Sequence, residues 1–110
     1  MKIELTPKQS AARDSFRDFV AEQLGEDVEI RPMFGGYGLY REDVFFGIVF
    51  KGRLYFRTGP LTRKEYVARG MKPFKPSARM TSKTYYEVPA DVLEDREAVR
   101  AWSMKASDRR

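Results

Sequence analysis

The sequence predicts an α+β fold: a two-layer arrangement with a mainly antiparallel five-stranded sheet and helices at the N-terminus, in the middle and at the C-terminus. Three observations support it: apolar residues at helical spacing near the N-terminus, a change to strand-forming residues after residue 28, and one later strand before a helical end. The length of 110 residues suits a single domain over residues 1–110.

The first helix is predicted over residues 7–24. Thr6 and Gln9 form a capping box around Pro7, which suits the first helical position. Apolar residues then recur at helical spacing to the end of this range, and Gly25 is a natural terminator.

A four-strand meander follows, with strands over residues 28–34, 37–41, 44–50 and 53–58. Lys51-Gly52 suits a two-residue hairpin turn, and Glu42-Asp43 is a second candidate turn that lacks glycine. Pro32 indicates that the first strand is an edge strand or is interrupted.

The remaining predicted elements are a short helix over residues 61–69, a fifth strand over 83–88 and a helical segment over 91–106. Thr62 and Glu65 form a capping box for the short helix, and Gly70 ends it. Asp95 is the predicted N-cap of the main C-terminal section.

The composition narrows the possible functions. The chain contains neither cysteine nor histidine, which removes disulfides, thiolate metal sites and the commonest general acid–base group. We therefore expect no enzyme activity, no metal site and no cofactor. The N-terminus turns polar at once and no apolar run is long enough for a membrane, so we expect a cytoplasmic protein.

The predicted register divides the sheet into two faces. With two residues in each turn, Gly38 would lie opposite Gly47, where a helix could approach closely. The helix-covered face would then carry Gly38, Tyr40, Phe45, Gly47, Val49, Leu54 and Phe56.

The opposite face is the candidate interaction face, and it comprises Tyr37, Arg41, Phe46, Ile48, Phe50, Arg53, Tyr55 and Arg57. Its mixture of large apolar groups and arginines favours a protein partner, or a second copy of the chain that would cover Phe46, Ile48 and Phe50. Two other interpretations remain open: the chain itself covers this face, or the face stacks single-stranded bases.

The segment 31–40 is the most distinctive stretch, with three glycines within four positions. It lacks the Gly-Lys-Ser/Thr pattern and the following helix of a phosphate loop. We therefore interpret it as a glycine-rich bend between two strands, with Met33 and Phe34 packed inward.

Together with Val44-Phe45-Phe46-Gly47, Arg53-Leu54-Tyr55-Phe56 and Tyr85-Tyr86-Glu87-Val88-Pro89, this segment resembles the N-terminal domain of the TfoX (Sxy) family. The resemblance implies a bacterial origin, an antiparallel α+β domain and a stand-alone form of it. Full-length members look like competence regulators that act with a cyclic-AMP-dependent transcription activator and carry a second domain. The resemblance supplies no catalytic residue, only a family signature of Arg31, Met33, Phe34, Gly35, Gly36, Tyr37, Gly38 and Tyr55.

Two functions follow as hypotheses. The first is a non-enzymatic regulatory or protein-interaction module, connected with transcription and binding either itself or a transcription-related partner. The alternative is direct nucleic-acid binding by a basic aromatic sheet face, which the net charge of +5 favours. The basic positions that motivate it are Arg31, Arg41, Arg53, Arg57, Lys72, Lys75, Arg79 and Lys83.

Overall fold

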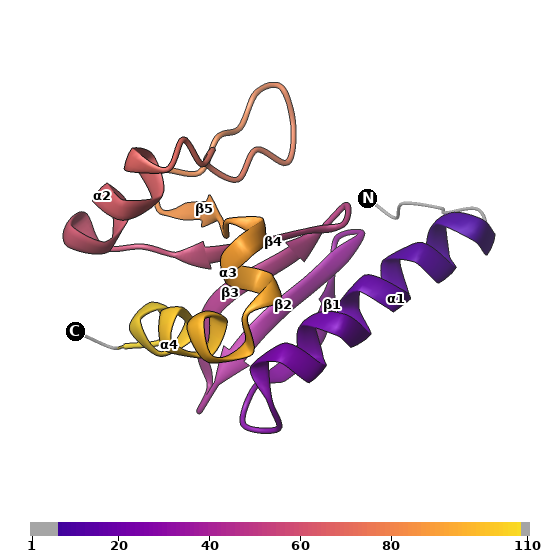
Figure 1. Cartoon of the computed structure of the whole chain (residues 1–110). Coiled ribbons are helices and arrows are strands. Elements are labelled where there is room, and N and C mark those ends of the chain that lie inside the picture. The colour runs from indigo at the N-terminus through magenta and orange to yellow at the C-terminus, as the bar shows by residue number, and fades with distance from the viewer. Residues whose placement is uncertain (1–6, 109–110) are drawn as a thin grey trace.

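The computed structural model describes residues 7–108, in which a five-stranded antiparallel sheet has the strand order β1-β2-β3-β4-β5. Helices α1, α3 and α4 lie on one face of this sheet, and α2 lies beyond its β5 end (Figure 1). The predicted α+β architecture is confirmed. The elements are α1 Pro7–Leu24, β1 Glu29–Met33, β2 Gly36–Arg41, β3 Val44–Phe50, β4 Arg53–Arg57, α2 Pro60–Ala68, β5 Tyr85–Glu87, α3 Ala90–Glu94 and α4 Arg96–Ala106.

The helix termini agree with the sequence predictions at most positions. The predicted N-cap Thr6 lies outside the described residues. Asp95 caps α4 as predicted, because its carboxylate accepts a hydrogen bond from the Ala98 N–H at 3.1 Å. The start of α2 differs from the prediction: Gly59 is the N-cap and its N–H donates to the Thr62 hydroxyl at 2.8 Å, so Thr62 is the third helical residue.

Both predicted two-residue turns are present. Glu42 and Asp43 have φ of 50° and 65°, and Lys51 and Gly52 have φ of 50° and 73°. Positive φ at both positions matches the right-handed twist of the strands on either side, and Glu42-Asp43 achieves it without glycine. Of the two possibilities predicted for the first strand, an edge strand or an interrupted one, the structure shows an edge strand, and β1 is continuous through Pro32.

The register between β2 and β3 corrects the predicted faces. Tyr40 lies opposite Phe45 as predicted, but Leu39 lies opposite Gly47, so Phe46 is an extra residue in β3. Such a β-bulge puts two consecutive residues opposite one partner and changes the in–out alternation of the strand by one. The prediction that Gly38 faces Gly47 is therefore wrong; Gly38 faces Ile48.

The bulge moves several residues to the other face. Three members of the predicted interaction face lie under the helices instead, namely Tyr37, Arg41 and Phe46, with 4%, 9% and 0% of their surfaces exposed. Conversely, Gly38, Tyr40 and Phe45, which were expected under the helices, lie on the opposite face. Beyond the bulge the prediction is correct, because Leu54 and Phe56 are in the core.

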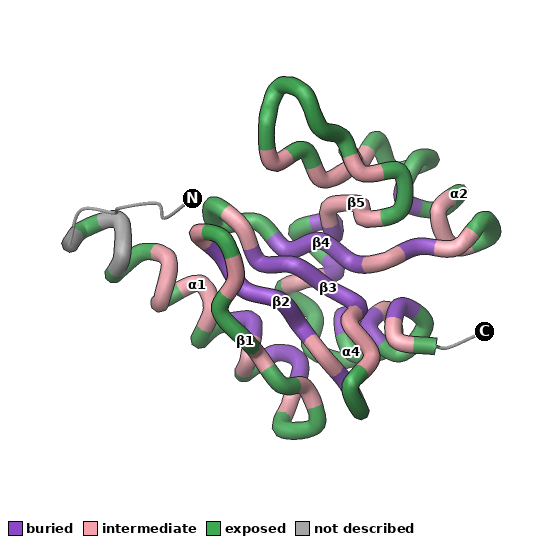
Figure 2. The backbone as a smooth tube through the Cα atoms, turned by 180° about the vertical axis from the view of Figure 1, so that it is seen from behind, coloured by how far each residue is buried: buried purple, intermediate pink, exposed green. Residues whose placement is uncertain are grey.

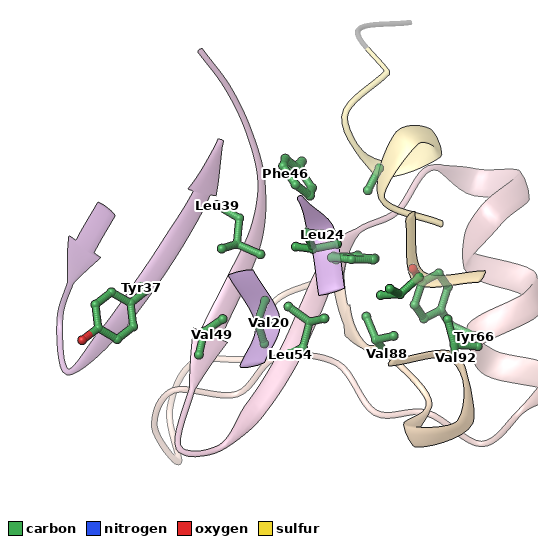
Figure 3. Close-up of a cluster of buried hydrophobic side chains, with 13 residues drawn as sticks. Val20, Leu24, Tyr37, Leu39, Phe46, Val49, Leu54, Tyr66, Val88 and Val92 are labelled. Carbon is green, nitrogen blue, oxygen red and sulfur yellow. The ribbon is translucent and has the colours of Figure 1, made fainter. Parts of the chain in front are cut away.

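The core fills the space between the sheet and the helices. Figure 3 shows Val20 and Leu24 of α1 close to sheet residues that include Leu39 and Val49. The side of α4 that faces the core contributes Val99, which is fully buried. This packing, rather than any single contact, is what keeps three helices on one face.

Arg41 connects the sheet to two other elements. Its Nε donates to the Asp27 carboxylate at 2.8 Å, and its two terminal nitrogens donate to the Ser103 carbonyl at 3.1 Å, the Ser103 hydroxyl at 3.0 Å and the Ser107 hydroxyl at 2.8 Å. The Ser103 carbonyl, which also accepts from the Ser107 N–H at 3.0 Å, belongs to the last turn of α4, where the helix dipole favours a cation. Arg41 therefore fixes the C-terminal end of α4 on the sheet.

Arg57 holds the same helix end from β4. Its Nε donates to the Ala106 carbonyl at 3.1 Å, and a terminal nitrogen donates to the Asp108 carbonyl at 2.8 Å. Two arginines that were predicted to face a partner thus contact α4 instead.

Replacing Gly36 by alanine should destabilise the protein by at least about 2 kcal/mol. A Cβ at Gly36 would overlap the carbonyl oxygen of Val49, which is fixed in the sheet. Chemical denaturation measures the change. Gly59→Ala is the matched control, because its Cβ would meet nothing within 4 Å; equal losses in the two variants would contradict the close approach.

Replacing Arg41 by methionine should cost roughly 3 kcal/mol of stability, since Ser103 is fully buried and its hydroxyl would lose the guanidinium donor, while its carbonyl would keep only the Ser107 N–H. Arg53→Met is the control: its ion pair with Glu87 is exposed on the arginine side and should contribute less than about 1 kcal/mol. Thermal unfolding of both variants checks this, and a smaller loss for Arg41→Met than for Arg53→Met would contradict the role of Arg41.

Candidate functional site

The signature segment forms the β1–β2 hairpin, so the interpretation as a glycine-rich bend between strands is confirmed. Gly35 supplies the positive φ of the turn, at 76°. Phe34 was expected to pack inward, but this is wrong: the side chain stands at the hairpin tip with 75% of its surface exposed. The turn position directs it away from both layers.

Tyr37 is the signature residue with the most contacts. Its hydroxyl donates to the Asp14 carboxylate at 2.7 Å and accepts from Arg17 at 3.2 Å. The guanidinium groups of Arg13 and Arg17 lie 5.5 and 5.2 Å from its ring centroid. Burial, followed by the bond to Asp14, raises the pKa of Tyr37, and the same bond lowers the pKa of Asp14. Tyr37 therefore attaches α1 to the hairpin rather than facing a partner.

The face of the sheet opposite the helices is here called the open face. Its aromatic rings are half-buried or buried. Figure 2 looks onto it, and none of the described helices crosses in front of β2 and β3. Phe45 lies between Tyr40 and Tyr85, at centroid distances of 5.2 and 5.4 Å. The open face comprises Tyr40, Phe45, Ile48, Phe50, Tyr55, Phe74 and Tyr85, with Arg31 and Arg53 beside them.

Part of the open face is covered by the chain itself, but not by the C-terminal helix. Phe74, from the segment between α2 and β5, packs against Phe50 at 5.5 Å and against Tyr55 at 4.9 Å. Beneath it, Tyr55 and Ile48 are 9% and 5% exposed. Phe74 was not predicted to lie on this face; its signal in the sequence is one aromatic residue between two prolines in a polar connection.

The arginines of the open face are already paired with carboxylates. Arg31 stacks over Tyr40 at 4.2 Å and contacts Glu29 at 2.9 Å and Asp43 at 3.4 Å. Arg53 contacts both carboxylate oxygens of Glu87, at 3.0 and 2.9 Å. The open face is therefore aromatic and close to electrically balanced.

The segment from Lys72 to Lys83, here called the basic loop, begins as a short extension of the sheet. The Glu87 N–H donates to the Lys72 carbonyl at 2.9 Å, and the Phe74 N–H donates to the Tyr85 carbonyl at 2.8 Å. A bridge between Ser77 and Met80 then closes the tip, which projects away from the sheet in Figure 1.

A cavity of about 340 Å³ lies where the basic loop meets the open face. Three cations line it, Arg53, Lys72 and Lys75, together with the Glu87 carboxylate that pairs with Arg53. Its chemistry suits an anionic oxygen ligand rather than an apolar molecule.

The described residues show no group of three or more side chains that could hold a metal ion, and none of their helices could span a membrane. Of the predicted interaction face, Ile48, Phe50, Arg53 and Tyr55 lie on the open face as expected. That these residues bind a partner stays a prediction.

Comparison with known proteins identifies the family. The model of the TfoX N-terminal domain matches residues 19–109. The DNA transformation protein TfoX1 of Aliivibrio fischeri (strain ATCC 700601 / ES114) is 36% identical over 83 residues, which is 74% of this chain and 39% of that protein. The chain thus spans about two fifths of the length of this relative. This match over most of the chain leads to one conclusion: the chain belongs to the TfoX N-terminal domain family.

Proposed function

We propose that this chain is a non-enzymatic regulatory module that binds a protein partner through its open face. The observation that carries the proposal is a sheet face without a helical cover, on which half-buried rings lie beside arginines that are already charge-balanced. The role would place the chain in the cytoplasm, next to the transcription apparatus.

The side chains of the open face support a protein partner. Tyr40, Phe45 and Arg31 are of the types that are enriched at protein–protein interfaces, and the two rings bury large areas with little loss of conformational freedom. Their near-neutral setting gives a phosphate backbone little to attract. The alternative of nucleic-acid binding by the sheet face is therefore the weaker of the two.

Family membership supports a regulatory role over a catalytic one. The relative in Aliivibrio fischeri is described as a DNA transformation protein, and the present chain corresponds to about two fifths of it. We propose that the chain serves the same broad process, by capturing a transcription-related protein.

The double variant Tyr40→Ser/Phe45→Ser should weaken partner binding by at least about 30-fold, which corresponds to about 2 kcal/mol for a binding hot spot. The partner would be captured on immobilised chain after nuclease treatment, identified by mass spectrometry, purified and titrated by calorimetry. Val67→Ser/Met104→Ser is the control, since both side chains are 57% exposed and lie on helices.

Unchanged binding by the Tyr40/Phe45 variant, with its fold confirmed by circular dichroism, would refute the role of the open face. A second copy of the chain is one permitted partner. In that case the wild type sediments as a dimer and the Tyr40/Phe45 variant as a monomer.

A further inference from the structure

The whole positive excess of the chain comes from one segment. Residues 66–86 contain five basic residues and no acidic residue, whereas the rest of the chain contains sixteen of each. The five are Arg69, Lys72, Lys75, Arg79 and Lys83. The net charge of +5 is thus a local property of this segment and not a general property of the surface.

Four of these five cations have no ionic partner among residues 7–108. Arg69 contacts the Asp91 carboxylate at 3.1 Å. The other four lie in the basic loop, are exposed and form no ion pair with a described residue. By contrast, three arginines of the sheet, Arg31, Arg41 and Arg53, form ion pairs, and Arg57 donates to the carbonyls of Ala106 and Asp108.

The sheet holds the base of this loop in place. Phe74 is packed against Phe50 and Tyr55, and the backbone of Lys72 is bonded to β5. Lys72 and Lys75 therefore flank an anchored residue and line the cavity beside Arg53. Ordering three cations around one cavity before a ligand arrives lowers the entropy cost of binding an anion there.

We propose that the basic loop binds the phosphate backbone of nucleic acid, with one phosphate at the cavity lined by Arg53, Lys72 and Lys75. The charges follow an irregular, projecting chain at intervals of three to four residues, and this arrangement can follow a row of phosphates. The aromatic residues of the loop and its flanking strand, Phe74 and Tyr85, are turned onto the sheet. The contact is therefore to the backbone, without base readout.

Two other polyanions fit the loop less well. Stable insertion into a membrane surface needs an apolar face in addition to basic charge, and within the loop only Met80 is a large exposed apolar side chain, at 63%. An acidic protein would need aromatic anchors on the loop, and the ring of Phe74 is packed inward. The proposal goes beyond the protein-binding function of the open face and uses the basic loop, which meets the open face at Phe74 and at the cavity beside Arg53.

The test compares two charge-matched triple variants of the full chain by fluorescence anisotropy with a labelled mixed-sequence DNA duplex. Lys72→Gln/Lys75→Gln/Lys83→Gln neutralises the loop. Lys8→Gln/Lys64→Gln/Lys105→Gln neutralises three exposed lysines elsewhere and lowers the net charge equally. Titrations run from about 50 mM to about 200 mM salt, because each phosphate contact contributes about 0.9 to the slope of log K against log salt.

The loop variant should bind at least about tenfold more weakly at low salt and lose about 2 to 3 units of the slope. The control should keep the wild-type slope, and a scrambled duplex should bind equally well. Absence of binding by the wild type at low salt would overturn the proposal, and so would equal weakening by both variants. Tighter binding to phosphatidylserine vesicles than to DNA would assign the loop to a membrane instead.

The two proposals are tested independently, because each variant should affect only one of the two binding assays. The Tyr40→Ser/Phe45→Ser variant should retain the wild-type salt slope on DNA, and the loop variant should retain protein capture. Loss of DNA binding in the Tyr40/Phe45 variant would mean that the sheet face itself contacts nucleic acid, and would overturn the assignment to the loop.

Discussion

The extra residue in β3 is the constraint on which the rest of the structure depends. Because Phe46 and Gly47 both lie opposite Leu39, the alternation of β3 changes there, and the alternate residues of β2 from Tyr37 to Arg41 are directed under the helices. Only from that side can Arg41 reach the end of α4. The same change directs the Tyr40 and Phe45 rings away from the helices and so creates the open face.

The helices and strands could be predicted from the sequence, but the β-bulge could not. Helical periodicity, the Asp95 cap and the two hairpin turns are local signals, and each of them was predicted correctly. The bulge has only a weak signal, the glycine at position 47 inside the strand, because Phe46 would be an ordinary strand residue on either face. Its position is decided by tertiary packing: Phe46 fills the core against Phe56, at a centroid distance of 5.7 Å. Assignments before the bulge were therefore inverted, whereas those after it were correct.

The fold divides its cations between two tasks. Arginines hold the structure together through bonds with fixed geometry, as Arg41 and Arg57 do at the end of α4. The lysines of the basic loop, Lys72, Lys75 and Lys83, form no ion pair with a described residue. If both proposals hold, a neutral aromatic face and a charged loop let one small domain contact a protein and a nucleic acid together. The net charge alone does not distinguish the cations that hold the fold together from those of the basic loop. Their hydrogen bonds and ion pairs distinguish them.

The central claim is that the bulge decides which rings are buried and which are free, and nuclear Overhauser effects between aromatic side chains test it most directly. The structure predicts cross-peaks between the Phe46 and Phe56 rings and a separate set joining Tyr40, Phe45 and Tyr85. A soluble paramagnetic probe should broaden the second set and leave the first unchanged. Broadening of Phe46, or contacts between Phe45 and the helix-side core, would contradict the register and with it the composition of the open face.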